Sequence, residues 1–384
     1  MRLHYIAPSV LPSRSANSIH VVHQCQGLVN AGVDVSLYAK RSIKDESLLP
    51  QNIEKNYGIS TKNISLVTYF SGITKADTLR IAWLSYKKIR GEEKPIILSR
   101  NLYASYILGV LNKRPLLFET HQLEFGFRKR IQQAIISRPW IRTIVISEKL
   151  AELLGEHHKK SLINPLVLHD AAPENIKPLP DSERYSVITN DLKEDISSWQ
   201  AICGYFGHLY RGRGIEIIEA LASRHPGCLF LVYGGNDQEV QRYRNENNKS
   251  NLRYRGYVPH PVAKKIMLSS DFLLMPYQEN VSISHNHKHD TARWMSPMKM
   301  FEYMATGRPV ISSDLPVLRE VLSNEYNSLL VKADDITSWS SAIRKLLENK
   351  ELAARIGKQA HLDYLNKYTW RKRAEEILQA SATL

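Results

Sequence analysis

The feature that most constrains the fold is a repeated order of segments: a short apolar run, a polar turn, then a stretch with helical periodicity. The apolar runs occupy residues 2–7, 33–39, 96–100, 116–119 and 143–147 in the first half of the chain. In the second half they occupy residues 201–206, 229–235, 252–258, 272–277, 309–313 and 328–332. Continuous apolar runs of this length are typical of parallel strands buried on both faces. Alternation with helices therefore predicts an α/β protein with doubly wound parallel sheets.

Helix signals separate the runs. Asn17 or Ser18 can cap a helix after the first run, and Gly32 stands where a left-handed residue would end it. In the second half, helical periodicity covers residues 215–222, 262–268 and 298–305, and a further stretch covers 352–378. The strand–helix–strand order predicts βαβ units in both halves.

The length of 384 residues suits two such domains. We expect a first Rossmann-like domain at residues 1–170, a linker with an insertion at 171–200, and a second Rossmann-like domain at 201–365. We expect residues 366–384 to form a helix that packs back on the first domain. Open parallel sheets bind ligands beyond the carboxyl ends of their strands, so two such domains facing each other predict one cleft with two half-sites.

Basic residues outnumber acidic ones by 52 to 38, a formal net charge of +14. An excess of this sign favours partners such as nucleic acid, nucleotide phosphates or an anionic membrane. Three cysteines without a Cys-x-x-Cys pair exclude a disulfide framework and a zinc ribbon, and suit a cytoplasmic protein. The sequence shows no apolar segment typical of a secretory signal or a membrane span, so we expect neither.

The first strand of the second half runs into a loop, residues 207–214, that begins Gly207-His208 and ends Arg213-Gly214 before a helix. Glycines and arginines at a helix N-terminus offer backbone donors, a positive dipole end and guanidinium groups to a diphosphate. The alternative interpretation is an ordinary turn with solvated arginines.

A second segment, residues 296–311, begins Ser296-Pro297-Met298 and carries Lys299 and Glu302. Three residues apart on a helix, an ammonium and a carboxylate lie on neighbouring faces. Such a cation can hold a phosphate, and such a carboxylate can accept both hydroxyls of a ribose. The alternative is a surface Lys–Glu pair with a few tenths of a kcal/mol of effect.

Together, these two segments resemble those of nucleotide-sugar glycosyltransferases of the GT-B fold, most of all the large retaining family numbered four. Weaker resemblance covers residues 13–20, 98–101, 118–121 and 164–170, so it extends over nearly the whole chain.

The resemblance implies roles for individual residues. Glu302 matches the carboxylate that binds the donor ribose, and Arg213 matches the basic residue that neutralises the leaving diphosphate. Lys299 and the helix start at Ser296, Pro297 and Met298 match the position of the donor diphosphate and sugar. His121 matches a first-domain histidine that faces the transferred sugar. The remaining donor-binding candidates are Gly207 and His208.

The sequence departs from the family at two places. Trp294 stands where a second glutamate often occurs, so we expect Asp290 or Arg293 to replace its contact with the sugar. Ala16-Asn17 replaces a glycine pair in the first-domain loop that leads to His20, and we expect Asn17 to supply the left-handed conformation.

These implications predict a retaining glycosyltransferase with a nucleotide diphosphate sugar as donor and a saccharide or lipid-linked acceptor, in surface polysaccharide, lipopolysaccharide or glycolipid assembly. No Asp-x-Asp triplet occurs, so we expect no metal and no other cofactor. The histidine-rich residues 285–290 are interpreted as a loop at the donor site rather than a metal site. The alternatives are a sugar-nucleotide epimerase of the same fold and a non-catalytic module that binds membrane or nucleic acid.

Much of the charge excess lies between Arg80 and Arg142, with thirteen basic and four acidic residues. Residues 75–90 form a basic amphipathic stretch, in which we expect Trp83 to face the sheet. Residues 125–130 set two phenylalanines beside a basic triplet. We therefore expect peripheral contact with an anionic membrane, on its cytoplasmic face, and no nucleic-acid partner.

Overall fold

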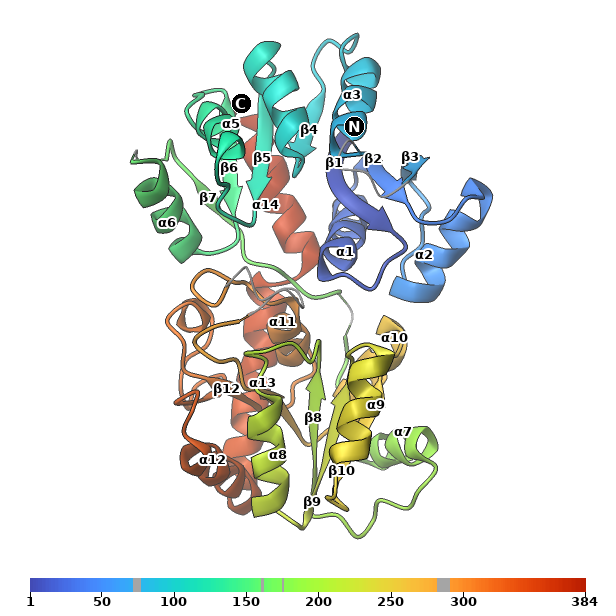
Figure 1. Cartoon of the computed structure of the whole chain (residues 1–384), viewed down its shortest axis with the longest axis vertical. Helices are drawn as coiled ribbons and strands as arrows, with labels where there is room; N and C mark the ends of the chain where they lie inside the picture. Colours follow the sequence, from blue (N-terminus) through green and yellow to red (C-terminus); the bar gives the residue numbers. More distant parts are fainter. Residues whose placement is uncertain (72–76, 160–161, 175, 282–290) are drawn as a thin grey trace. The chain divides into compact units, whose positions relative to one another are not determined.

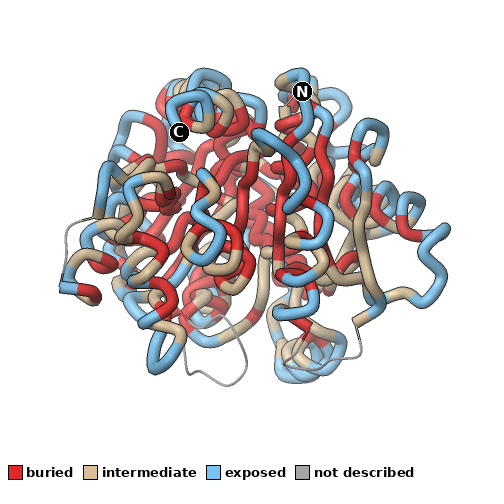
Figure 2. Tube along the Cα trace, turned by 90° about the horizontal axis from the view of Figure 1, so that it is seen from above, coloured by how far each residue is buried: buried red, intermediate tan, exposed pale blue. Residues whose placement is uncertain are grey.

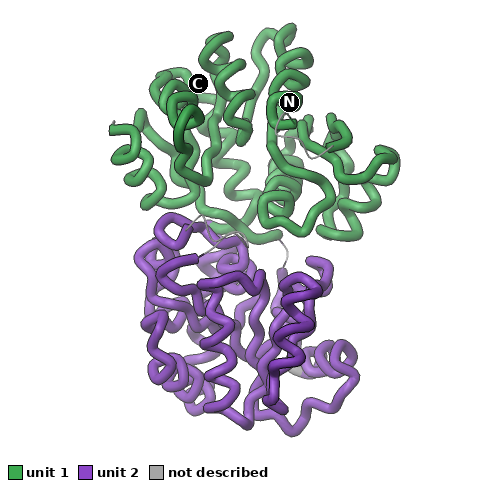
Figure 3. Tube along the Cα trace, viewed as in Figure 1, with its two compact units in different colours: residues 1–173, 368–384 green, residues 174–367 purple. Residues whose placement is uncertain are grey.

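The chain forms two compact units, and each is built on its own parallel sheet (Figure 3). Unit 1 combines Met1–Pro173 with Tyr368–Leu384, and unit 2 is Glu174–Lys367. The computed structural model describes residues 1–71, 77–159, 162–174, 176–281 and 291–384. The structure confirms the α/β class and the parallel sheets, whereas the predicted cleft stays a prediction.

The sheet of unit 1 has seven parallel strands in the order β3-β2-β1-β4-β5-β6-β7. They are β1 (Arg2–Leu11), β2 (Asp34–Arg41), β3 (Ile64–Phe70), β4 (Ile96–Ser99), β5 (Leu116–Thr120), β6 (Ile141–Val145) and β7 (Leu166–Val167). The apolar runs predicted five of them. The sequence analysis missed the edge strands β3 and β7, because β3 is mostly half-exposed and β7 has two residues.

Successive side chains of the unit 1 strands alternate between two cores. Tyr5 and Leu117 pack against one layer of helices, whereas Ile6 and Phe118 pack against the other. The first layer holds α1 (Ala16–Asn30), α2 (Leu49–Tyr57) and α14 (Trp370–Ala382). The second holds α3 (Asp77–Ile89), α4 (Leu102–Ser105), the π-helical turn Tyr106–Leu111 and α5 (Phe127–Ile136). The strands are buried between these layers, as Figure 2 shows in red.

Three local predictions about unit 1 are wrong. Ser15, not Asn17 or Ser18, caps α1, because its side chain accepts from the Ser18 amide. Asn17 consequently lies inside the first helical turn and has no left-handed conformation. Trp83 is 53% exposed, so it lies on the outer side of α3 instead of facing the sheet, which Ile81 and Ala82 contact.

The sheet of unit 2 has six parallel strands in the order β10-β9-β8-β11-β12-β13. They are β8 (Ala201–Phe206), β9 (Cys228–Tyr233), β10 (Leu252–Gly256), β11 (Phe272–Met275), β12 (Val310–Ser313) and β13 (Leu329–Val331), all predicted from their apolar runs. The helices of unit 2 are α7 (Asp181–Leu192), α8 (Ile215–Arg224), α9 (Asp237–Glu246), α10 (His260–Ser269), α11 (Met298–Ala305), α12 (Ile336–Glu348) and α13 (Lys350–Lys367). Helix α6 (Glu148–His158) and two short 3-10 turns, Glu46–Leu48 and Leu318–Glu320, complete the list.

The segment expected to be linker and insertion contains a helix, α7, which packs against α10. Arg184 of α7 is buried and bonds Asp271, which precedes β11. Sequence reasoning missed this helix because its polar residues mask the apolar period.

The chain leaves unit 2 and returns to unit 1 at Tyr368 (Figure 1). The helical stretch predicted at 352–378 is two helices, α13 and α14, because Thr369 caps α14 by accepting from the Lys372 amide. Helix α14 packs on α1 at Gly27, where a Cβ atom would lie 2.4 Å from the Trp370 carbonyl oxygen. The C-terminal residues therefore pack as an integral part of unit 1.

The three cysteines are free and buried. Among the described residues, no helix combines the length and the apolar character that a membrane span requires.

Candidate active site

The order in which the chain adds strands to the sheet of unit 2 reverses between β8 and β11. From β8 the chain moves to β9 and β10 on one side, and from β11 it moves to β12 and β13 on the other. Doubly wound sheets bind their ligands beyond the carboxyl ends of the strands at such a point. The loops that follow β8 and β11, together with α11, bring Gly207, Arg213, Lys299 and Glu302 to this place.

The loop after β8 owes its shape to glycines. Gly207 has φ of +152° and Gly214 has φ of +77°, conformations that side chains with a Cβ rarely adopt. A Cβ on Gly214 would also lie 1.9 Å from the Pro276 carbonyl oxygen. The loop therefore packs directly on the segment after β11, and a Cβ on Gly207 would lie 3.5 Å from the Lys299 Nζ.

Lys299, in the first turn of α11, is held by aromatic rings. Its Nζ lies 4.2 Å from the centre of the Tyr205 ring and 4.4 Å from that of Tyr277. Among the described residues no carboxylate forms an ion pair with it. Burial lowers the pKa of Lys299 well below its ordinary value, the Arg213 guanidinium lowers it further, and Glu302 opposes the shift.

Arg213 lies beside Tyr277, one of the two tyrosines that hold Lys299. Its Nη1 donates to the Tyr277 hydroxyl at 3.0 Å, and its guanidinium lies 5.2 Å from the ring centre. Arg213, Lys299, Tyr205 and Tyr277 are called the Lys299 cluster below. The cluster concentrates positive charge, so its chemistry fits an anion such as a diphosphate.

Glu302 lies one turn further along α11 and bonds His260, the first residue of α10, at 2.5 Å. Both side chains are partly buried. Sequence reasoning missed His260, because only the sheet brings α10 next to α11. One carboxylate oxygen is thereby fixed by the protein.

The other donor-binding candidates of unit 2 lie near the start of α11 or in the loop at residues 207–214. Ser296 is buried, Pro297 precedes the first helical residue, and that residue is Met298. The His208 ring stacks on Tyr210 with 4.7 Å between ring centres. Arg293 is exposed before α11, while Asp290 and the histidine-rich loop lie outside the described residues.

Unit 1 holds a second charged cluster, centred on the buried carboxylate of Glu119 in β5. Its Oε1 accepts from Arg373 of α14 and from His121 at 2.8 Å each, and it lies 3.1 Å from the His20 Nε2. The other ring nitrogen of His20 lies 2.9 Å from Asp170. These five residues and Arg100 are called the Glu119 cluster below.

His121 follows β5 directly, and Arg100 follows β4. An Arg100 Nη2 lies 3.1 Å from the His121 Nδ1. Burial lowers the pKa of His121 to about 4, and Arg100 adds to the shift. Burial alone would raise the pKa of Glu119, but Arg373 and then His20 hold it well below its ordinary value. The His121 ring is therefore neutral and the Glu119 carboxylate charged at neutral pH.

The first-domain loop candidates are in the helix instead. Ala16 is exposed and Asn17 is half-buried in the first turn of α1, and His20 is buried one turn later. His20, His121 and Asp170 place one ligand atom each within 4.8 Å of one another, a spacing that a metal could use. Arg373 pairs with Glu119 and Arg100 lies against His121, so positive charge already surrounds these ligand atoms and disfavours a further cation.

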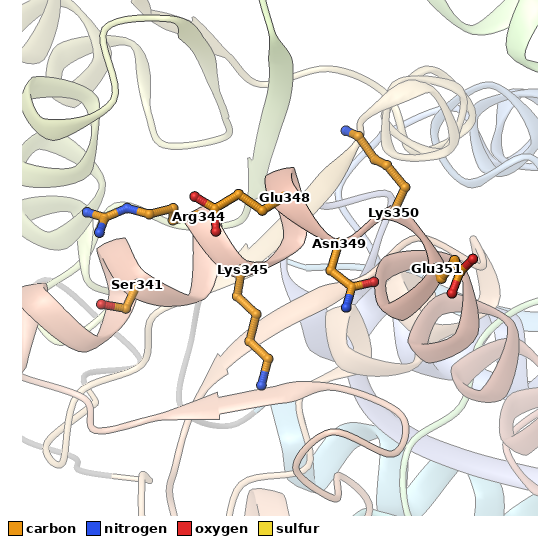
Figure 4. Close-up of a pocket in the computed structure, with 7 residues that line it drawn as sticks. All are labelled: Ser341, Arg344, Lys345, Glu348, Asn349, Lys350 and Glu351. Carbon is orange, nitrogen blue, oxygen red and sulfur yellow. The ribbon is translucent and has the colours of Figure 1, made fainter.

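A surface hollow of about 620 Å³ lies where α12 meets α13 (Figure 4). Its charged side chains, among them Arg344, Lys345 and Lys350, point in different directions rather than toward one point. None of the candidate residues lines it, so we assign it no role in the site.

Comparisons with known proteins show which sequences and folds this chain is similar to. Residues 213–379 match the model of the family described as "Glycosyl transferase-like". The phosphatidyl-myo-inositol mannosyltransferase of Mycolicibacterium smegmatis is 25% identical over 170 residues, which are 44% of this chain. The matched part is only 40% of the length of that relative.

Two solved structures share the fold over the whole chain. The crystal structure of Anabaena HepE in complex with UDP and glucose has a TM-score of 0.71 at 16% identity, with 100% of both chains covered. Sucrose-phosphate synthase from Thermosynechococcus elongatus has a TM-score of 0.73 at 15% identity, covering 100% of this chain and 98% of that one. The chain therefore shares the two-domain GT-B fold of these structures over its whole length, and its residues 213–379 are similar to the glycosyl transferase-like family.

Proposed function

We propose that this chain is a retaining, metal-independent glycosyltransferase that moves a sugar from a nucleotide diphosphate donor, bound by unit 2, to an acceptor bound by unit 1. The observation that carries the proposal is the Lys299 cluster. Two cationic side chains lie within reach of one tyrosine ring at the switch point of the sheet, and no described carboxylate pairs with Lys299. A diphosphate would supply the missing negative charge.

Bond breaking between sugar and diphosphate increases the negative charge on the diphosphate. Arg213, Lys299 and the amides at the start of α11 would stabilise that charge more strongly in the transition state than in the ground state. In the proposed retaining reaction the acceptor hydroxyl attacks from the face that the diphosphate leaves, and the leaving phosphate takes the proton. No side-chain general base is needed, which fits the neutral, fully engaged ring of His121.

Glu302 would hold the ribose hydroxyls with the carboxylate oxygen that His260 leaves available. The names of the similar proteins give the donor screen its starting point. HepE was crystallised with UDP and glucose, and the mycolicibacterial relative is a mannosyltransferase. We propose a hexose donor of this general kind.

The acceptor would be a saccharide or lipid-linked sugar of surface polysaccharide, lipopolysaccharide or glycolipid assembly, reached at the cytoplasmic face of a membrane. The N-terminal ends of α3, α4 and α5 form a continuous row. Asn101 donates to the Thr78 carbonyl at 3.0 Å, and Arg128 lies over the Tyr103 ring at 5.6 Å.

Helices α3 and α5 also expose aromatic side chains beside basic ones. Trp83 is 53% exposed and Phe127 is 72% exposed, with Lys87 and Arg130 exposed nearby in the sequence. Exposed aromatic side chains with Lys and Arg are typical of surfaces that rest on anionic lipid. Arg128 contributes less than the sequence indicates, because it pairs with Glu124.

The test is a thermal-shift screen of nucleoside diphosphates and their sugars in excess EDTA. A donor at 100 times its dissociation constant adds about 2.7 kcal/mol of stability, which is readily measured. Incubation of the best donor with no acceptor tests for the epimerase, since an epimerised nucleotide sugar would identify it. The absence of saturable binding by any nucleoside diphosphate would contradict the proposal and favour a non-catalytic module.

A further inference from the structure

The C-terminal helix α14 reaches the centre of unit 1 through one buried side chain, Arg373, which is 2% exposed. All three parts of its guanidinium are bonded. Nε donates to the His169 carbonyl at 3.0 Å, Nη1 to the Gln24 side chain, and Nη2 to Glu119 at 2.8 Å. Such a fork fixes the Glu119 carboxylate in position and in charge.

The partners of His121 determine where its proton lies. A guanidinium can only donate, so the His121 Nδ1, 3.1 Å from Arg100, must accept. A charged carboxylate can only accept, so the Nε2, 2.8 Å from Glu119, must donate. These two contacts are compatible with one state of the ring, the neutral tautomer protonated at Nε2.

We infer that Arg373 and Glu119 are positioning residues for His121, which they hold as the neutral Nε2–H tautomer at the carboxyl end of β5. The inference deepens the proposed function and rests on it for the effect on turnover, because the family resemblance implies that His121 faces the transferred sugar. It assigns part of the reaction site to α14, a segment far from His121 in the sequence.

Arg373 is needed to keep Glu119 charged, because this carboxylate accepts hydrogen bonds from several donors at once. Five charged or titratable groups surround Glu119 and His121. They are Arg100, His20, Asp170, Arg373 and Tyr5. Without the guanidinium, the buried carboxylate would face His20 and His121 with no fixed positive partner. A proton taken up by an imidazole would then replace the lost charge. The His121 ring would become cationic or exchange between forms, and its fixed orientation would be lost.

The experiment uses the full chain labelled with ¹⁵N at histidine, with His121→Gln to assign the ring signals. We expect wild-type His121 to show one protonated nitrogen, Nε2, and one unprotonated nitrogen, Nδ1, at neutral pH. We expect Arg373→Met to show a doubly protonated or exchanging ring, and Arg373→Lys, which keeps the charge, to restore the wild-type pattern. Arg371→Met is the matched control, because Arg371 lies on the same helix but is exposed and pairs with Glu375.

The double variant Glu119→Gln with Arg373→Met removes both charges and should return a neutral ring. In turnover, Arg373→Met should lower kcat at least tenfold with an unchanged KM for the donor, and Arg371→Met should change neither. An Nδ1–H or cationic ring in wild type overturns the inference, and so does a wild-type ring pattern in folded Arg373→Met. The wild-type measurement does not depend on the folding of any Arg373 variant. Nucleoside diphosphate binding by unit 2 tests the proposed function separately, since the ring state does not depend on it.

Discussion

The two charged clusters of this protein differ in whether the protein itself or a bound ligand supplies the neutralising charge. In the Glu119 cluster, Arg100 and Arg373 face two buried carboxylates, so the protein neutralises itself. In the Lys299 cluster, two cations share tyrosine rings, and Lys299 has no ion pair among the described residues. A cluster with its own buried ion pair fixes side chains in place, whereas a lysine held by aromatic rings can receive an anion.

The largest expected effect comes from removing the lysine of the Lys299 cluster. Lys299→Ala should lower turnover on the order of 100-fold or more, because the ammonium group that stabilises the leaving diphosphate in the bound state is lost. Steady-state kinetics and nucleoside diphosphate affinity measure this effect. Lys332→Ala removes an exposed lysine of the same unit and should have no effect. An active, folded Lys299→Ala would show that the cluster is not the diphosphate site.

The second prediction concerns the selectivity of Glu302 for ribose. Hydrogen bonds to a charged group contribute about 1.5 to 3 kcal/mol, so Glu302→Ala should lose roughly 10- to 150-fold of the preference for a ribonucleotide over its 2′-deoxy form. Calorimetric titration with both nucleotides gives the ratio. His260→Ala keeps the carboxylate and should retain most of the preference. A ratio unchanged in Glu302→Ala would remove the ribose assignment.

The third prediction compares the two units in acid. In unit 1, burial lowers the pKa of His121 and His158 to about 4 and also lowers the pKa of His169. In the described part of unit 2, burial lowers the pKa of one histidine, His225. Unfolding lets such histidines take up protons, so stability falls as pH falls from about 6.5 toward 4.

The depressed pKa values of Glu119 and Asp170 add to this loss at lower pH, because their contribution exists above the ordinary carboxyl pKa and disappears as the folded groups take up protons. Unit 1 should therefore lose protection before unit 2. Hydrogen exchange measured by mass spectrometry, corrected for the intrinsic pH dependence, follows both units in one sample. Earlier loss of protection in unit 2 would contradict the contrast between the clusters.

The smallest expected effect concerns the exposed row of unit 1. Phe127→Ser with Lys129→Ser and Arg130→Ser should weaken binding to phosphatidylglycerol vesicles, since each basic residue near such a surface contributes about 1 kcal/mol. Co-sedimentation at low and high salt measures the effect, with neutral vesicles as comparison. Lys358→Ser with Leu365→Ser and Lys367→Ser changes exposed residues of unit 2 and serves as control. Equal binding to both vesicle types would favour a soluble acceptor.

The sequence predicted the features that depend on local pattern. The run at residues 272–277 and the helix at 298–305 follow from apolar period, and the structure confirms both as β11 and α11. Lys299 and Glu302 could be named because their spacing lies within one helix. Such features need no knowledge of what packs against them.

The remaining features depend on tertiary contacts that a single sequence does not display. His260 meets Glu302 across 42 positions, and Arg373 meets Glu119 across 254. The exposure of Trp83 was mispredicted because Ile81 and Ala82 of the same helix cover the sheet. Asn17 lies in the first helical turn and not in a loop because Ser15, two residues earlier, caps the helix.

Calorimetric titration of the full chain with a nucleoside diphosphate tests the central claim, that the Lys299 cluster binds a diphosphate without metal. The titration is run in excess EDTA and in Mg²⁺, in two buffers with different heats of ionisation. We predict the same affinity in EDTA and in Mg²⁺. We also predict net proton uptake at neutral to alkaline pH, because burial lowers the pKa of Lys299 and a bound diphosphate would raise it again. Affinity should accordingly fall as pH rises. Binding that requires Mg²⁺, or that is unchanged in Lys299→Ala, would contradict the claim.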